Sequence, residues 1–168
     1  MHLTSARLGL LIATAYLTAL FLPAVDWIVV GTKLQPGSAS DTLPGWQALL
    51  AAVSQVPVIW EASTLGRAVR AALSALSGLT NIILLLGLVA LIWRALVLRG
   101  RFGVRLEVAL WVAATINTHW FLYLGEEYPV RSALRVGYFV WLGCFVVLAL
   151  VIRAVRRPTE REAIAPAV

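Results

Sequence analysis

Four apolar runs, each about as long as a bilayer-spanning helix, constrain the fold of this chain more than any other feature. A helix needs about 20 mostly apolar residues to cross a bilayer. The runs occupy residues 8–30, 75–97, 105–125 and 134–155. Because backbone polar groups inside hydrocarbon must bond within their own segment, runs of this length fold as helices. The sequence therefore predicts an all-α integral membrane four-helix bundle, with one transmembrane domain over 1–156 and a flexible cytoplasmic tail over 157–168.

The composition agrees with lipid as the main solvent. Hydrophobic residues make up 61% of the chain and charged residues 13%, whereas soluble proteins are nearer half apolar and a quarter charged. The net charge of +6 raises the question of nucleic acid. The basic residues gather at the ends of the apolar runs and form no continuous stripe for phosphate contacts. This pattern argues against nucleic acid and favours the lipid bilayer as the partner.

The distribution of basic residues orients the predicted spans. With four crossings, nine of the 14 Lys and Arg residues fall on the side of the two termini and five on the other. The contrast is sharpest at "RGRFGVR", residues 99–105, a short basic turn between the second and third runs. The positive-inside rule therefore predicts a multi-pass protein of the cell (inner) membrane with both termini in the cytoplasm. The loops at 31–74 and 126–133 then face outward.

The tryptophans are placed as interface anchors would be. Trp and Tyr concentrate where a membrane meets water. Two tryptophans fall near the predicted inner boundary, and these are Trp93 and Trp111. Four fall near the outer boundary, and these are Trp27, Trp46, Trp60 and Trp120. The tryptophan pattern therefore supports the same threading as the basic residues.

The first outer loop contains more than linker. The stretch "WQALLAAVSQVPVIW", residues 46–60, is apolar but too short to span, which is typical of an interfacial or re-entrant segment, and Pro57 should break it. The next stretch, "STLGRAVRAALSALSG", has apolar residues at helical spacing. We therefore expect an additional interfacial, amphipathic helical segment over about 46–73. Its last part either lies on the outer surface or runs straight into the second span.

Four polar residues at the outer ends of the apolar runs form a candidate functional cluster: Asp26, Asn81, Asn117 and His119. Unpaired polar groups in lipid are costly, so such residues mark function or helix packing. With a rise of about 1.5 Å per residue, all four fall in the outer leaflet, and the inner half of the bundle is nearly free of them. Helical spacing puts Asn117 and Trp120 on one face and His119 elsewhere, so this stretch cannot aim every group at one ligand.

Two interpretations of this cluster stay open. In the first, the residues line a small polar pocket on the outer face, where His119 titrates or binds a headgroup or metal, with Asp26 or Glu126 as its partner. In the second, Asn81 and Asn117 hydrogen-bond helices together, Asp26 reaches water and His119 lies in an aromatic belt.

The sequence contains no catalytic or cofactor signature. A P-loop, H-E-x-x-H, G-x-S-x-G and C-x-x-C are all absent. The single cysteine, Cys144, lies in an apolar run, which is typical of a small buried hydrophobe. His119 with Glu126 or Glu127 has no recognised metal-ligand spacing. We therefore predict a protein that is not an enzyme and that holds no cofactor and no metal.

Three short motifs are spread over most of the chain. They are LPA at Leu22–Ala24, PGWxxL at Pro44–Leu49 and GYxxWL at Gly137–Leu142. Together they resemble a loose group of small bacterial membrane proteins with four spans and no assigned role. The resemblance implies a type of fold and no activity.

The small size of the predicted bundle bears on function. A bundle of four helices leaves little room for a translocation pathway through its interior. Helices rich in aromatic residues and alanine are suited to packing against lipid or against a larger assembly. We therefore expect a non-enzymatic accessory or structural subunit of a larger membrane complex, with other membrane protein subunits as partners. The alternative is a small transporter, channel or ligand-binding membrane protein that uses the outer polar cluster.

Overall fold

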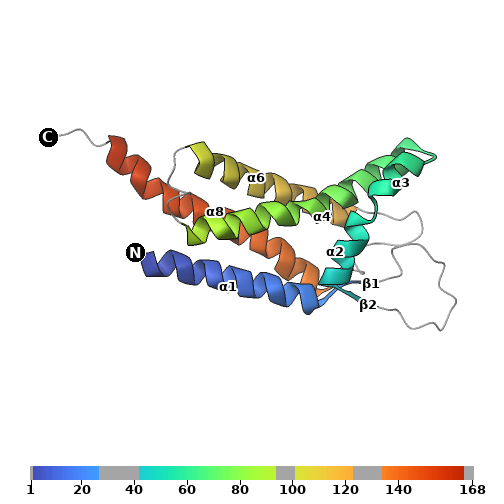
Figure 1. Cartoon of the computed structure of the whole chain (residues 1–168), viewed down its shortest axis with the longest axis horizontal. Helices are drawn as coiled ribbons and strands as arrows, with labels where there is room; N and C mark the ends of the chain where they lie inside the picture. Colours follow the sequence, from blue (N-terminus) through green and yellow to red (C-terminus); the bar gives the residue numbers. More distant parts are fainter. Residues whose placement is uncertain (1, 27–41, 94–100, 123–133, 165–168) are drawn as a thin grey trace.

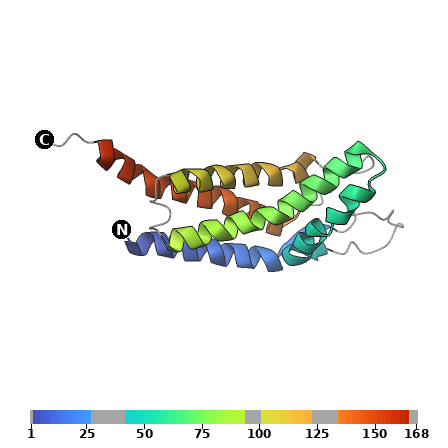
Figure 2. The same cartoon turned by 45° about the horizontal axis from the view of Figure 1, so that its top comes forward.

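Helices make up most of the computed structural model, which describes residues 2–26, 42–93, 101–122 and 134–164. Within these ranges the long helices run side by side along the longest axis (Figures 1 and 2), and they are α1 (His2–Phe21), α4 (Leu65–Ile92), α6 (Arg101–Asn117) and α8 (Val136–Ile164). The N- and C-termini lie at one end, which we name the termini end (Figure 1). The opposite end carries the shorter elements and is named the sheet end: β1 (Pro23–Asp26), β2 (Thr42–Pro44), α2 (Gly45–Val53) and α3 (Val56–Glu61).

Two of the described helices are long and apolar enough to cross a membrane. They are α4 and the Val136–Arg156 part of α8. In α1 the apolar stretch Ala6–Phe21 is shorter, and α6 has 17 residues that include Arg101, Arg105 and Glu107. By length and composition alone, the described residues therefore supply two spans where the sequence predicted four.

The first apolar run, expected to be helical over 8–30, stops being helical at Phe21. Proline lacks an N–H and its ring clashes with the carbonyl four residues earlier, so Pro23 ends α1 where the sequence prediction had one helix continue to residue 30. β1 begins at Pro23 and pairs antiparallel with β2, forming a two-stranded sheet that the all-α prediction did not include. Residues 27–30 of this run lie outside the described residues.

Backbone hydrogen bonds fasten this sheet to its neighbours. The N–H of Gly45, at the start of α2, donates to the carbonyl of Leu22 at 3.1 Å. The N–H of Arg135, just before α8, donates to the carbonyl of Ala24 at 2.8 Å, next to an isolated bridge between Val25 and Leu134. The sheet therefore holds the end of α1, the start of α2 and the start of α8 together.

The segment expected over about 46–73 is helical, but it is divided among three helices. α2 ends at Val53 and α3 begins at Val56 with Pro57 in its first turn, so the break falls where a proline prevents one continuous helix. The amphipathic stretch then runs straight into the second apolar run as the 28-residue helix α4. Thr64 caps this helix, because its hydroxyl accepts the N–H of Arg67 at 3.3 Å.

The third run differs from its predicted bounds at both ends, since α6 begins at Arg101, and the fourth run differs mainly at its C-terminal end. α6 stops at Asn117, and after a turn at Thr118 the short helix α7 (His119–Leu122) follows. The Thr118 hydroxyl donates to the carbonyl of Thr115 at 2.6 Å, a local bond that competes with regular helix. α8 continues through residues 157–164, where the sequence predicted a flexible tail, and 165–168 lie outside the described residues.

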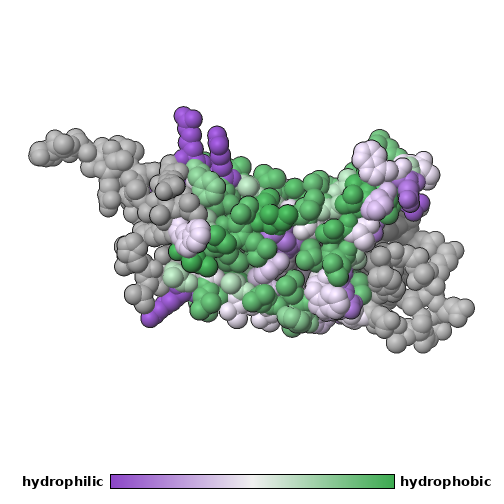
Figure 3. All heavy atoms as spheres, viewed as in Figure 1, coloured by the Kyte–Doolittle hydropathy of each residue, from purple (hydrophilic) through white to green (hydrophobic). Residues whose placement is uncertain are grey.

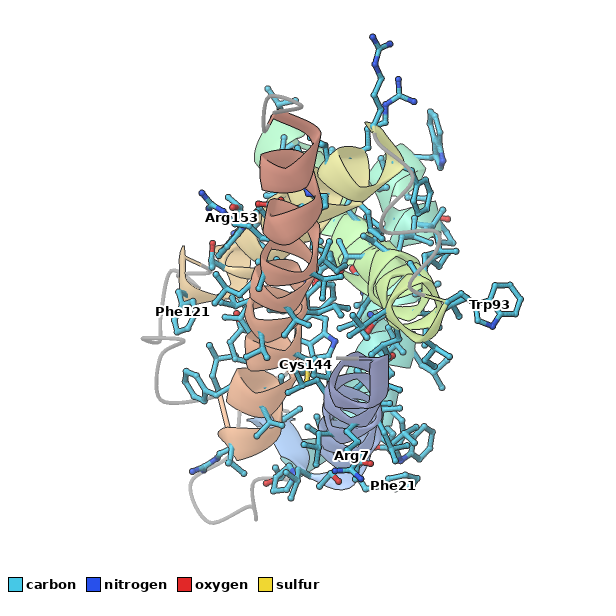
Figure 4. All side chains as sticks on the ribbon, turned by 90° about the vertical axis from the view of Figure 1, so that its left-hand side faces the viewer. Arg7, Phe21, Trp93, Phe121, Cys144 and Arg153 are labelled. Carbon is cyan, nitrogen blue, oxygen red and sulfur yellow. The ribbon has the colours of Figure 1, made fainter. Side chains whose placement is uncertain are left out.

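One apolar core joins the long helices in the half nearer the termini end. Its fully buried side chains include Leu84, Leu91, Leu110, Phe145, Leu148 and Ile152. Gly87 lets α4 approach α8 closely, since a Cβ there would lie 2.7 Å from Cδ2 of Leu148. Cys144 is buried, and Figure 4 places it between α8 and α1, with its Sγ 3.9 Å from the carbonyl oxygen of Ile12. The expectation of a buried, hydrophobe-like cysteine is confirmed.

The outward faces of the long helices are also apolar. On α4 the exposed side chains follow a helical stripe: Leu79, Ile82, Leu85, Leu86, Val89 and Ile92. Similar exposed stripes run along α1 with Leu10, Leu11 and Leu17, and along α6 with Val104, Val108 and Val112. In Figure 3 hydrophobic residues cover the middle of the long axis, and hydrophilic residues of this face lie mainly toward its two ends.

Candidate functional site

Buried polar side chains gather on one face of α4. Ser74, Ser77, Thr80 and Asn81 are all buried, and Gly78 lies among them. Residues 74, 77, 78 and 81 are three or four positions apart and so lie on one face of the helix. This face therefore contacts one set of neighbouring elements. Those neighbours come from α1, α2, α7 and α8, as the hydrogen bonds and the cavity described below show.

Asn81 connects three helices through its side-chain amide. Its Oδ1 accepts the hydroxyl of Tyr16 from α1 at 3.0 Å and the indole N–H of Trp141 from α8 at 2.8 Å. Its Nδ2 donates to the carbonyl of Gly78 at 2.8 Å. Because the amide oxygen has two lone pairs and both are used, Asn81 fixes α1 and α8 against α4.

Asn117, on α6, likewise connects its helix to α4 and α8. Its Nδ2 donates to the hydroxyl oxygen of Thr80 at 3.1 Å, and its backbone carbonyl accepts the hydroxyl of Tyr138 at 2.7 Å. Asn81 and Asn117 therefore hydrogen-bond helices together, which is the packing role that one of the two interpretations assigned to them.

Trp120 and His119 form hydrogen bonds with different elements. The indole N–H of Trp120 donates to the Ser77 hydroxyl oxygen at 3.1 Å, so Trp120 faces α4 together with Asn117. The Nδ1 of His119 lies 2.7 Å from the carbonyl oxygen of Ile116, and a carbonyl only accepts, so Nδ1 is the donor. His119 is buried against the Trp120 ring, with ring centroids 4.8 Å apart.

Asn81 and Asn117 have different hydrogen-bond partners. Asn81 bonds to Tyr16 and Trp141, and Asn117 bonds to Thr80. Asp26 is the last residue of β1 and pairs in register with Thr42. Glu126 and Glu127, proposed as partners of His119, lie outside the described residues, as does Trp27.

A cavity of about 140 Å³ lies beside the polar face of α4 at the sheet end. One wall consists mainly of small and apolar residues from the end of α1 and from α2, among them Ala19, Ala48, Ala51 and Ala52, with Gln55 just after α2 as its polar member. The facing wall carries hydrogen-bonding groups from α4, α7 and α8: Ser74, Ser77, Asn81, Trp120, Tyr138 and Trp141. Among the described residues this lining includes Trp120 but not His119.

Two glycines allow the elements around the cavity to approach one another. A Cβ on Gly45 would collide with the carbonyl oxygen of Ala19, so only glycine lets α2 start against the end of α1. A Cβ on Gly137 would lie 2.8 Å from the carbonyl oxygens of both Leu22 and Pro23. The two motifs PGW and GY thus supply the close contacts at the sheet end.

A second polar centre lies toward the termini end. The sequence analysis had predicted that this half of the interior would contain almost no polar groups. Nη2 of Arg156 on α8 lies 2.9 Å from Oε2 of Glu107 on α6, and Nε of Arg153 lies 3.8 Å from Oε1. Glu107 is only 9% exposed. The signal was available, because Glu107 is an acidic residue inside an apolar run and Arg153 and Arg156 share one helical face.

The candidate interface anchors fall into two groups. Trp46, Trp60 and Trp93 are exposed, and Trp93 projects away from the helices at the end of α4 (Figure 4). Trp111 and Trp120 are partly buried. The exposed group is therefore available for contacts outside the molecule.

The described residues contain no group of three or more His, Cys, Asp or Glu side chains that could hold a metal ion. The chain matches no known family model, no curated protein and no solved structure.

Proposed function

We propose that this protein is an integral membrane protein in which α1, α4, α6 with α7, and α8 each cross the bilayer. The main support for this proposal is that the outward face of each long helix is apolar. A core helix of a soluble protein is mostly buried, whereas only 33% of the apolar window of α8 is buried; α4 is 56% buried but carries a continuous exposed apolar stripe. Soluble monomers rarely expose contiguous apolar patches of this kind. At about 1.5 Å per residue α4 is about 42 Å long, which exceeds the ~30 Å hydrocarbon thickness.

The charges support an orientation with both termini in the cytoplasm of a cell (inner) membrane. Basic residues of three helices gather at the termini end: Arg7, Arg101, Arg105, Arg153 and Arg156. Fewer stand at the other end: Arg67 and Arg70 in the first turns of α4, and Arg135 just before α8. By the positive-inside rule, the termini end faces the cytoplasm and the sheet end faces outward.

Cysteine labelling tests this threading. A Cys144→Ala background removes the native thiol, and Ser63→Cys and Ala6→Cys place single thiols at opposite ends, both at exposed positions. A membrane-impermeant maleimide should label the Ser63→Cys variant in intact cells and the Ala6→Cys variant only after permeabilisation. Equal labelling of both in intact cells would contradict the orientation, and recovery of the protein in the alkali-soluble fraction would contradict membrane insertion.

Within the membrane, we propose a non-enzymatic role as an accessory or structural subunit of a larger complex. The support is a preformed, cross-linked interior: Asn81, Asn117 and the Glu107–Arg156 pair tie the helices together, while bulky apolar and aromatic side chains point outward. Affinity purification in mild detergent followed by mass spectrometry should recover other membrane protein subunits at fixed stoichiometry. Isolation only as a free monomer would count against this role.

The cavity favours a second candidate, a ligand-binding membrane protein. Between the cavity and the Glu107–Arg156 pair the interior is filled by large apolar side chains, including Leu84, Leu110 and Phe145. A plug of this kind opposes passage of water or ions through the helices. The geometry therefore supports binding at the sheet end better than it supports a channel or transporter.

A further inference from the structure

The cavity at the sheet end has walls of two different chemistries. Ala48, Ala51 and Ala52 of α2 present methyl groups on one side, next to one amide, Gln55, whose Nε2 lies 3.5 Å from the carbonyl oxygen of Ala51. On the other, α4 presents Ser74, Ser77 and Asn81, a polar row on one helical face. A molecule that enters is therefore oriented, with its polar edge toward α4 and its apolar body toward α2.

The polar row keeps hydrogen-bonding capacity after its protein contacts are counted. The Ser77 oxygen accepts from Trp120, which leaves its hydroxyl hydrogen able to donate. Asn81 uses its Nδ2 once, on Gly78, and the amide carries a second N–H. The Ser74 hydroxyl makes no hydrogen bond to any described residue, although Ser74 is 3% exposed and lines the cavity. These groups can satisfy a hydroxyl or carbonyl.

The size and charge of the cavity limit what fits. An apolar cavity of about 150 Å³ is large enough for benzene, so the 140 Å³ here accommodates a ring or a short chain, or the end of a longer molecule. The described residues of the lining carry no charged side chain. An ionised ligand would lose its hydration without a counter-charge, which is costly.

We propose that this cavity binds a neutral amphiphile with a hydroxyl or carbonyl head and a slim apolar body. The proposal rests on the proposed membrane location, because a bilayer concentrates such molecules beside the helices. The head bonds to Ser74, Ser77 and Asn81, and the body packs on the alanines of α2. The apolar core beyond Asn81 closes the site, so the amphiphile binds and does not pass through.

Photolabelling with a diazirine-bearing octanol tests the site. The full-length protein in mild detergent is irradiated with the probe, and labelled peptides are mapped by mass spectrometry. We expect saturable labelling of α2 and of the polar face of α4 that excess unlabelled octanol suppresses and octanoate, the ionised analogue, does not. Labelling spread evenly over the exposed leucines and isoleucines, without competition, would overturn the proposal, as would equal competition by octanoate.

Matched variants separate binding from folding. Ala51→Leu fills the cavity from α2 and should lower labelling of the polar face of α4 about tenfold, a loss of about 1.4 kcal/mol in binding. Ala72→Leu makes the same change on α4 outside the lining and should leave the labelling unchanged. Unchanged labelling in a folded Ala51→Leu variant would refute the site.

A second pair of variants tests the head of the ligand. The double variant Ser74→Ala with Ser77→Ala keeps the cavity open but removes both hydroxyls, so labelling by the alcohol should weaken while labelling by an all-hydrocarbon diazirine persists. An equal response of the two probes would show that the hydroxyls play no part. Loss of specific labelling with the cysteine topology intact rejects this inference alone, whereas failed membrane insertion rejects the proposed function first.

Discussion

Asn117 on α6 and Thr80 on α4 face each other in the interior, with Nδ2 of the amide 3.1 Å from Oγ1 of the hydroxyl. Both side chains are buried, and Asn117 is 0% exposed. The Thr80 hydroxyl also donates to the carbonyl of Ser77 at 2.6 Å. The pair is therefore a buried polar contact between two helices.

Replacing Asn117 by leucine should loosen α6 from α4 while keeping the branched shape and the number of side-chain heavy atoms. Side-chain hydrogen bonds between membrane helices average about 0.6 kcal/mol and reach about 1.7 kcal/mol, so we expect a loss of unfolding free energy in that range. Chemical denaturation in detergent measures it. Thr115→Ala removes a hydroxyl that bonds only within α6, at an exposed position, and should change stability far less. A Thr80→Val partner variant closes the double-mutant cycle, and zero coupling would contradict the contact.

Breaking the Glu107–Arg156 ion pair should lower the free energy of unfolding more than the Asn117 substitution does. Both side chains are mostly buried, at 12% and 15% exposure, so Glu107→Ala leaves a buried guanidinium without its carboxylate. Breaking a buried ion pair from one side costs about 3 to 5 kcal/mol, and the residual exposure here places the expectation near the lower figure. The unfolding midpoint in detergent should fall accordingly.

The neighbouring arginine is the matched control for this pair. The Arg153 side chain is 48% exposed and lies 3.8 Å from Glu107, so Arg153→Gln should cost less than about 1 kcal/mol. The double variant Glu107→Leu with Arg156→Leu should recover much of the stability lost by Glu107→Ala, because no charge is left buried. Equal losses for Arg153→Gln and Glu107→Ala would show that the pair is not a buried unit.

Local sequence patterns predicted the helices well and their ends less well. The break before Pro57 and the passage of the amphipathic stretch into α4 follow from proline chemistry and helical spacing. The end of α1 at Phe21 was missed, because hydropathy does not distinguish a short apolar strand such as β1 from a further helical turn. The pairing of β1 with β2 spans a long connection, which no local pattern reveals.

At the candidate site, too, local spacing predicted which residues share a helical face, but it did not predict contacts between residues far apart in sequence. Spacing alone placed Asn117 and Trp120 on one face, and both side chains form hydrogen bonds with α4. The partners of Asn81 could not be predicted, since Tyr16 and Trp141 lie 65 and 60 residues away in sequence. Both look like ordinary core or interface aromatics in the sequence. The cavity depends on four helices and a sheet meeting, so it has no sequence signature at all.

The close start of α2 against α1 predicts that Gly45 cannot be replaced. In Gly45→Ala the new methyl would collide with the carbonyl oxygen of Ala19 and lie 3.0 Å from the Leu20 Cα, both backbone atoms. We expect a loss of about 1 to 3 kcal/mol from overpacking. Gly66→Ala is the control, because a Cβ there meets nothing within 4 Å and alanine favours helix. Thermal unfolding in detergent should show a lower midpoint for the first variant and an unchanged or higher one for the second.

The two donors that converge on Asn81 predict nearly equal, partly redundant effects. Tyr16→Phe removes the hydroxyl 3.0 Å from Oδ1, and Trp141→Phe removes the indole N–H at 2.8 Å while retaining an aromatic ring near Phe145. Each should cost about 0.5 to 1.5 kcal/mol of unfolding free energy. Together they leave the buried oxygen without either donor, so the double variant should lose more than the sum of the single losses. Strict additivity in denaturant titrations would mean that Asn81 does not join α1 and α8 through one atom.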